Sequence, residues 1–136
     1  MNNTLRVADV MTADIHSVDG LATVADAVEA MRRHAVSSLV VARRHDGDEY
    51  GLVVVADIAR KVIAENRPLD RTNVYEVMSK PILTLRSDML ARYAVRLLVQ
   101  FDLSRGVAID HDRNIVGMVT MRDLVLRLAE ADVAEE

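Results

Sequence analysis

The chain contains one sequence unit twice. When the 136-residue sequence is shifted by 67 residues, apolar and glycine positions of the first half fall on like residues of the second half. The matches keep their order along the whole unit, with a one-residue deletion in one turn. A unit of about 60 residues buries its sheet face poorly alone, so we expect the two copies to pack together and share a core. The matched pairs include Val7 with Val74, Met11 with Met78, Ala27 with Ala94, Ser37 with Ser104, Gly51 with Gly117 and Asp57 with Asp123.

Apolar residues at spacings of three and four predict one amphipathic helix in each copy. The first helix ends near His34, and Thr23 with Asp26 forms its N-terminal capping pair. The second helix begins at Ser87 or Asp88 and ends near Asp102.

Short β-branched runs follow each of these helices and are separated by polar turns, which predicts an antiparallel hairpin in each copy. Amphipathic segments follow both hairpins, and a brief edge strand precedes each first helix. The sequence therefore predicts the order β-α-β-β-α twice, an α/β (α+β) protein. The hairpin strands are Leu39–Val41 with Gly51–Val55 and Gly106–Ile109 with Ile115–Thr120; the amphipathic segments are Ala56–Asn66 and Met121–Ala131; the edge strands are Ile15–Val18 and Ile82–Leu85.

The repeat divides the chain into a first domain at 1–66, a polar linker at 67–73 that contains Pro68, a second domain at 74–131 and a C-terminal tail at 132–136.

Composition excludes several classes of function. The net charge of -4 offers no basic surface for nucleic acid. The chain has no cysteine for a disulfide, a thiolate metal site or a nucleophile. No apolar run approaches the roughly 20 residues of a membrane span, and the N-terminus has no secretion signal. We expect a soluble cytoplasmic protein. Because phosphate loops, serine elbows and paired carboxylates are also missing, we expect no enzymatic activity.

The repeat is carried by a set of motifs that covers nearly the whole chain and occurs twice in the same order. The motifs are Val7–Thr12 with Val74–Ser79, Ala27–Met31 running into His34–Val41, and Gly51–Ile58 with Gly117–Leu124. This set resembles the cystathionine-β-synthase-type domain, or CBS domain. The resemblance implies two pseudo-twofold-related β-α-β-β-α CBS units packed sheet against sheet in one module. It also implies a module that senses adenosine compounds, does not catalyse and commonly forms a homodimer.

The residues Gly117, Thr120 and Asp123 form a Gly-x-x-Thr-x-x-Asp pattern with its own chemical logic. A threonine at the start of a helix can offer its hydroxyl and nearby amides to a phosphate. The aspartate can accept both ribose hydroxyls, and Arg122 can neutralise phosphate.

The family arrangement implies that this pattern shares a cleft with residues of the other copy, which gives a first nucleotide site. Backbone groups near Ile15 and His16 would read the adenine edge, and Val36 with other aliphatic chains would enclose the ring. The implied first site is Thr12, Ile15, His16, Val36, Ser37, Ser38, Thr120, Arg122 and Asp123.

A second cleft is implied by the pseudo-twofold axis, but it departs from the pattern. Val54 stands where the other copy has the hydroxyl of Thr120, and Ala56 stands where it has Arg122. A lost hydrogen bond to a charged group costs about 1.5–3 kcal/mol, so we expect binding weaker by roughly one to two decades. The implied second site is Val54, Asp57, Ser79, Ile82, Leu83, Leu103 and Ser104.

Other interpretations of these residues stay open. Asp57 and Asp123 can simply cap helices, Thr120 can make a local hydrogen bond, and Ser37 with Ser38 can be turn residues. The four histidines have no spacing of a metal-ligand set. The functional hypothesis is a sensor of AMP, ADP or ATP that needs no cofactor and signals to an unknown effector protein. The alternatives are a structural dimerisation module with vestigial clefts, or a sensor of S-adenosylmethionine or a dinucleotide.

Overall fold

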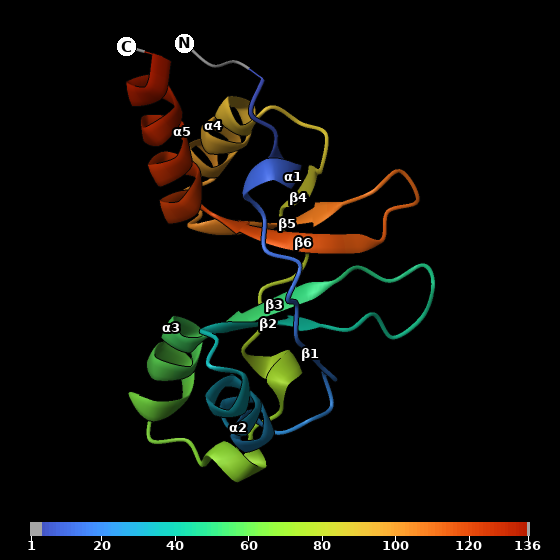
Figure 1. The fold of residues 1–136 in the computed structure, drawn as a ribbon. Coiled ribbons are helices and arrows are strands. Elements are labelled where there is room, and N and C mark those ends of the chain that lie inside the picture. The colour runs from blue at the N-terminus through green and yellow to red at the C-terminus, as the bar shows by residue number, and fades with distance from the viewer. Residues whose placement is uncertain (1–3, 136) are drawn as a thin grey trace. The chain divides into compact units, whose positions relative to one another are not determined.

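A computed structural model describes residues 4–135 of the chain, with side chains through residue 131. It divides into two compact units, one formed by His16–Ile82 and the other by Met1–Ile15 with Leu83–Glu136. Each unit is a three-stranded sheet with helices on one face (Figure 1). The units thus follow the two copies of the repeat except at the opening segment of each copy, residues 7–15 and 74–82.

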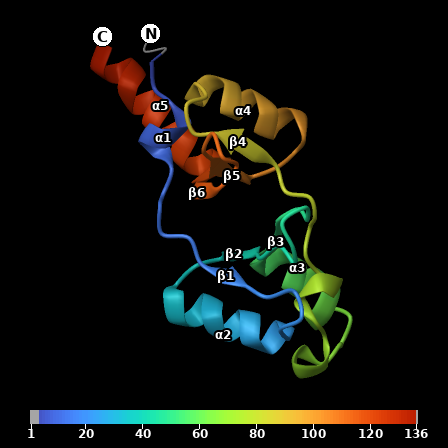
Figure 2. The same cartoon turned by 90° about the vertical axis from the view of Figure 1, so that its right-hand side faces the viewer.

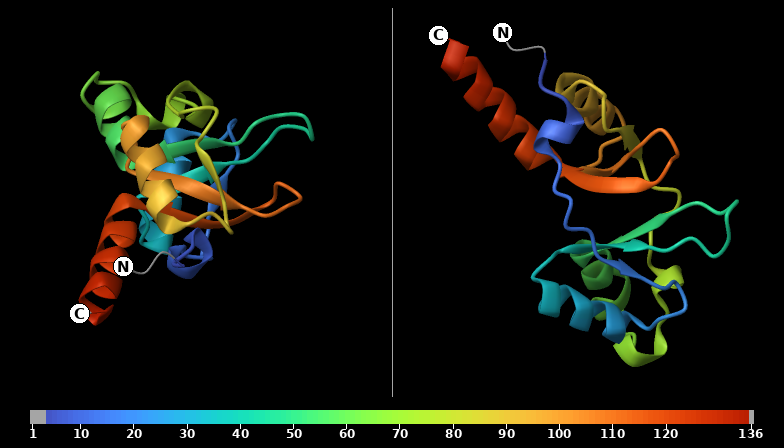
Figure 3. Two further views of the ribbon diagram at one scale, coloured as in Figure 1. Left: turned by 90° about the horizontal axis from the view of Figure 1, so that it is seen from above. Right: turned by 45° about the vertical axis from the view of Figure 1, so that its right-hand side comes forward.

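The unit His16–Ile82 has the sheet order β1-β2-β3, with β1 parallel and β3 antiparallel to β2. The helices of this unit cover one face of its sheet (Figure 2), and the β2–β3 turn extends past them (Figure 3). Its elements are β1 (Ser17–Val18), α2 (Val24–His34), β2 (Ser38–Val41), β3 (Gly51–Val54), α3 (Val55–Ile58), a π-helical turn at Ala59–Ile63, and 3-10 turns at Leu69–Arg71 and Val74–Glu76.

The second unit repeats this plan with the order β4-β5-β6, again parallel then antiparallel. Its last helix continues through Glu135, so the backbone of the expected tail is helical as far as that residue. The side chains of residues 132–135 and the whole of Glu136 lie outside the described part of the chain. The elements are α1 (Val7–Val10), β4 (Thr84–Arg86), α4 (Ala91–Gln100), β5 (Arg105–Ile109), β6 (Ile115–Thr120) and α5 (Met121–Glu135).

Both predicted antiparallel hairpins and the capping pair of α2 are confirmed. The Thr23 hydroxyl accepts a hydrogen bond from the Asp26 amide at 3.1 Å, and the Thr23 amide donates to the Asp26 carboxylate at 3.2 Å.

The predicted start of the second helix is wrong. Helix α4 begins after Leu90, and no side chain caps it. The amide of Ala91 instead donates to the carbonyl of Leu5 at 2.7 Å, so a backbone group from the opening segment replaces the expected Ser87 or Asp88. The amide of Val24 makes the matching bond to Thr72 in the other unit at 2.8 Å.

The amphipathic segment Ala56–Asn66 is likewise not one regular helix. It consists of the short α3 and the π-helical turn, and Asn66 has a positive φ of 55°. The corresponding segment of the second copy forms the regular helix α5.

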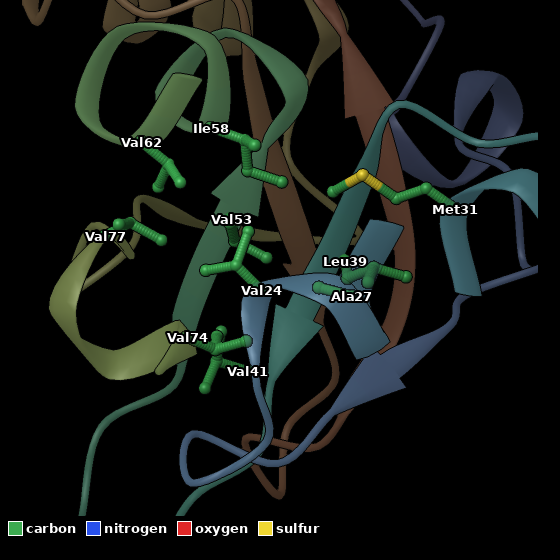
Figure 4. Packing of buried hydrophobic residues seen from close by; sticks show 10 residues of the cluster. All are labelled: Val24, Ala27, Met31, Leu39, Val41, Val53, Ile58, Val62, Val74 and Val77. Carbon is green, nitrogen blue, oxygen red and sulfur yellow. The ribbon is translucent and has the colours of Figure 1, made fainter. Parts of the chain in front are cut away.

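Each unit has its own apolar core beneath the sheet. In the unit His16–Ile82, Val24 and Met31 of α2 pack with Val53 of β3. Val74 and Val77, which begin the second copy of the repeat, complete this core (Figure 4). The other core forms in the same way, because Val7 and Val10 of the first copy pack with Leu85, Leu98 and Leu124.

The polar linker is docked on the unit rather than extended in solvent. Thr72 is buried, and its hydroxyl donates to the carbonyl of Pro68 at 2.8 Å. Arg67 and Glu76 form an ion pair at 2.7 Å. The Asn73 amide and this arginine both hold the pKa of Glu76 below its ordinary value.

Two methionine–glycine contacts seat the opening segments. Met11 lies against Gly117 of β6, and Met78 lies against Gly51 of β3. Beside each contact the segment pairs with the strand: Thr12 exchanges two backbone hydrogen bonds of 2.9 Å with Met118, and Ser79 pairs with Leu52 in the same way. The repeated Met and Gly positions are therefore explained by close approach of one backbone to another side chain.

No helix in the described part of the chain combines the length and the apolar character that crossing a membrane requires.

Substitution of Gly117 tests the methionine contact. A Cβ at this position would lie 2.6 Å from Sδ and 2.8 Å from Cγ of Met11, so the methionine must move. We expect Gly117→Ala to lower the free energy of unfolding by about 1–3 kcal/mol, measured by urea denaturation. Gly47→Ala is the control, because its nearest neighbours lie at 3.6 Å, and it should change stability little.

The double variant Met11→Ala/Gly117→Ala identifies the cause. If the collision is responsible, the two substitutions together cost less than the sum of their separate effects. Strict additivity would contradict this explanation.

Candidate functional site

The junction of β6 and α5 carries the three residues of the predicted phosphate and ribose pattern. Thr120 is the last strand residue, and its hydroxyl accepts a hydrogen bond from the Asp123 amide at 3.1 Å. The hydroxyl therefore caps α5, which agrees with the interpretation that Thr120 makes a local hydrogen bond. Its proton remains able to donate to an anion, because the capping bond uses only a lone pair.

The charged groups of this junction are accessible. The side chain of Arg122 is 79% exposed and lies 3.4 Å from the carboxylate of Asp123, which is 36% exposed. Such an exposed pair contributes little to stability. Both groups can therefore turn to a ligand at small cost.

Thr12 reaches the same strand through the opening segment. Besides its backbone pairing with Met118, its hydroxyl donates to the Met118 carbonyl at 3.4 Å. Since Met118 and Thr120 are two residues apart on β6, Thr12 belongs to the same end of this sheet. Ile15 lies in the same unit, and its backbone amide donates a hydrogen bond to the carbonyl of Ala13.

The remaining residues of the predicted first site lie in the unit His16–Ile82. His16 precedes β1, and its carbonyl accepts from the Val40 amide at 3.0 Å. Val36 follows α2, the Ser37 carbonyl accepts from the Val55 amide at 3.0 Å, and Ser38 is a buried residue of β2. Of the predicted adenine contacts, Ile15 therefore belongs to the unit that carries the phosphate pattern, whereas His16 and Val36 belong to the other unit.

The predicted second site has a different local chemistry around its aspartate. The Asp57 side chain is only 10% exposed; Arg60 lies 3.0 Å and Lys61 4.0 Å from its carboxylate. Lys61 also donates to the carbonyl of Val77. Val54, at the start of α3, makes no capping hydrogen bond. The carboxylate of Asp57 is therefore paired with cations from the π-helical turn that follows its helix.

The other members of the second set take structural positions. Ser79 pairs with β3, and Ile82 ends the same unit. In the other unit, the Leu83 carbonyl accepts from Val107 at 3.1 Å, and the Ser104 carbonyl accepts from Met121 at 2.8 Å. Leu103 precedes Ser104 and is exposed.

Two side-chain arrangements were not expected from the sequence. Arg60 lies one helical turn after Asp57, and that spacing is a usable signal for the ion pair. The rings of His16 and His34 stack at 3.7 Å between centroids, with 15° between their planes. No sequence signal links these two histidines, because His16 precedes β1 and His34 ends α2, far apart along the chain.

The Asp110–His111–Asp112 cluster forms a hairpin turn. One oxygen of Asp110 accepts from the amides of Asp112 and Asn114, both at 2.9 Å. Arg86 approaches the Nδ1 atom of His111 at 2.8 Å. Among the residues that the structure describes, no three histidine or acidic side chains gather as metal ligands.

Comparison with known proteins identifies the family. The CBS domain family matches residues 7–64 and 74–130. The chain belongs to the CBS-domain family. It is a tandem CBS pair: 30% identical over 120 residues to the CBS domain-containing protein YhcV of Bacillus subtilis, with 88% of this chain and 83% of that protein covered.

Solved CBS structures share the fold. The hexameric CBS-CP12 protein from bloom-forming cyanobacteria is 32% identical with a TM-score of 0.85, covering 90% of this chain and 67% of that one. The CBS domain of a bacterial CNNM/CorC family Mg²⁺ transporter in complex with ATP has a TM-score of 0.75 at 21% identity, covering 90% and 86%.

Several relatives are longer than this chain. An uncharacterized protein of Methanopyrus kandleri is 26% identical over 122 residues, 90% of this chain and 62% of its own length. The homoserine O-acetyltransferase of Methanohalobium evestigatum is 29% identical over 127 residues, 91% of this chain but 25% of the enzyme. The CBS pair therefore occurs within proteins of different overall activity.

Ala35 positions Val36 and the two serines, and it offers a test of the local backbone. It ends α2 with φ 54° and ψ 46°, in the left-handed region that favours glycine. We expect Ala35→Gly to raise the free energy of unfolding by about 0.5–1 kcal/mol, since relieved strain exceeds the added chain freedom. Ala30→Gly, inside α2, should lower it by about 1 kcal/mol. Equal losses for both variants in urea denaturation would contradict strain at Ala35.

Proposed function

We propose that this CBS pair is a regulatory module that binds an adenine nucleotide and signals to a partner protein. The observation that carries the proposal is the β6–α5 junction, where a hydroxyl, an exposed guanidinium and a half-exposed carboxylate meet at the start of a 15-residue helix. The helix start favours phosphate, and the carboxylate suits the two ribose hydroxyls. The ATP complex of the CNNM/CorC CBS domain supports the ligand class, because it has the same fold.

The two copies of the repeat are expected to bind unequally. Thr120 and Arg122 have no counterpart hydroxyl or guanidinium at Val54 and Ala56. The Asp57 carboxylate is also more buried than that of Asp123 and is held by Arg60, which competes with a ribose. We therefore propose one tight nucleotide site per chain, which uses Asp123. The assignment of Ile15, His16 and Val36 to the adenine stays a prediction, and so does the place of Ser37 and Ser38 in the same site.

Thermal shift with AMP, ADP and ATP tests the ligand. At 100 times its dissociation constant, a ligand stabilises the folded chain by about 2.7 kcal/mol, which should raise Tm by roughly 4 °C or more. S-adenosylmethionine in the same panel tests the alternative adenosine ligand. No shift with any adenosine compound would refute the sensor and leave a structural module.

Paired variants test the site. Asp123→Ala and Asp123→Asn should abolish the shift, and both variants keep the bond from the amide of residue 123 to the Thr120 hydroxyl that caps α5. Asp57→Ala is the matched control and should leave the shift nearly unchanged. The reverse order, or calorimetry with two equal tight sites, would contradict the proposed asymmetry.

We also propose that the chain forms a homodimer through an apolar groove. Val28 and Met31 of α2 and Ile58 and Ile63 of the following segments line a cavity of about 330 Å³, and Ile63 is 58% exposed. The cyanobacterial CBS-CP12 relative is hexameric, which supports self-association in this family. An apolar groove of this kind is typical of a surface that another protein covers.

Sedimentation tests the dimer. At micromolar concentration we expect a dimer for the natural chain and a monomer for Ile63→Glu, because the buried charge has no partner. Leu21→Glu is the control, since Leu21 is equally exposed at 59% but lies outside the groove. A natural chain that sediments as a monomer would refute the proposal.

A further inference from the structure

A second hollow lies at the opposite end of the β2–β3 hairpin from Ser38 and Asp57. Its volume is about 220 Å³, and it lies where Val41 pairs with Gly51, whereas Ser38 pairs with Val54 at the other end. It is enclosed by the loop before α2, the end of β2 and the segment after the linker. The lining residues used below are Gly20, Leu21, Val41, Arg44, Tyr75 and Lys80.

The apolar lining of this hollow includes an aromatic ring. Val41 is buried, while Leu21 and Tyr75 are exposed. At Gly20 an added Cβ would meet Val41 at 3.5 Å and Tyr75 at 3.8 Å, which are ordinary contact distances, so the glycine leaves room for about one methyl group beside these side chains. With its volume of about 220 Å³, the hollow as a whole can hold a small ring or a branched aliphatic group.

Of the two cationic side chains that line the hollow, Lys80 has a counter-charge and Arg44 has none among the residues that the structure describes. Lys80 lies 2.7 Å from Asp48, and Asp48 also accepts from the backbone amide of Arg44 at 3.0 Å. These contacts, that of Lys80 foremost, hold the pKa of Asp48 well below its usual range, so Lys80 has a full counter-charge. The guanidinium of Arg44 makes no hydrogen bond or ion pair with the residues described, which leaves one positive charge beside the apolar surface.

The second copy of the repeat does not preserve this hollow. Ser87 and Asp88 stand where the first copy has Gly20 and Leu21, and Ala8 stands in place of Tyr75. Arg86 pairs with the Asp88 carboxylate at 3.2 Å, and Arg6 donates to its carbonyl at 2.6 Å. The fold therefore forms without an aromatic ring or a single unpaired cation at this place, and the hollow is particular to one unit.

We propose that this hollow binds a small organic anion with an apolar body, such as an aromatic carboxylate. Arg44 holds the carboxylate, for which its planar guanidinium is suited, and Leu21, Val41 and Tyr75 enclose the body. This site uses none of the residues assigned to the nucleotide, so it stands or fails independently of the sensor proposal.

Benzoate is the probe, and amide chemical shifts in NMR are the measurement. We expect saturable shifts at Gly20, Leu21, Ala42 and Tyr75 with a dissociation constant on the order of 1 mM, as suits so small a ligand. Benzamide, which has the same ring without the charge, should bind at least ten-fold more weakly. Equal affinity for benzamide would refute the role of the cation.

Matched arginine variants assign the charge. Arg44→Gln should weaken benzoate about ten-fold, whereas Arg43→Gln should leave it unchanged, because Arg43 is engaged with the Asp46 carbonyl and the Tyr50 ring. Gly20→Val should fill the hollow and remove binding while its spectrum remains that of a folded chain. Shifts spread over the surface, equal effects of both arginine variants, or no shifts at all would each overturn the proposal.

Discussion

The contact on which the architecture depends is that of a methionine with a glycine, made once in each unit. Met11 packs on Gly117 and Met78 packs on Gly51, so each opening segment lies against the sheet of the other copy of the repeat. Only a residue without a Cβ allows so close an approach. The valines beside each methionine then complete a core that the rest of the unit leaves open, and the adjoining residue pairs with the strand. The duplication is thus a requirement of packing, since neither copy closes its own core.

Local patterns predicted much of the fold. The hairpins followed from β-branched runs with polar turns, and the cap of α2 followed from Thr23 and Asp26, because these signals act over a few residues. The start of α4 failed for the opposite reason. Its first amide is satisfied by the carbonyl of Leu5, far away in sequence, and such a partner leaves no local mark. The same limit applies to the opening segments, because the sheet that each one joins belongs to the other copy of the repeat and leaves no local signal.

The candidate site shows the same division between local and long-range information. The pattern of Thr120 and Asp123 was readable because both lie on one strand-to-helix junction. The burial of Asp57 was not, although the spacing to Arg60 indicated an ion pair. This difference matters for chemistry: of two aspartates at equivalent positions, Asp57 is more buried and pairs with Arg60, and the second copy has Leu126 in place of that arginine. The two copies thus share the same arrangement of strands and helices but differ in the residues at the β3–α3 and β6–α5 junctions.

The division into units has a kinetic consequence. The unit His16–Ile82 is one continuous stretch of chain, so its contacts close loops no longer than the unit itself, such as that between Gly20 and Tyr75. The other unit must join Met1–Ile15 to Leu83–Glu136, and this closes a loop over the whole intervening unit. Closing that loop costs more chain entropy when the intervening unit is unfolded than when it is already folded and compact. The continuous unit is therefore the natural first stage of folding, and its completion brings the two distant segments of the other unit within reach of each other.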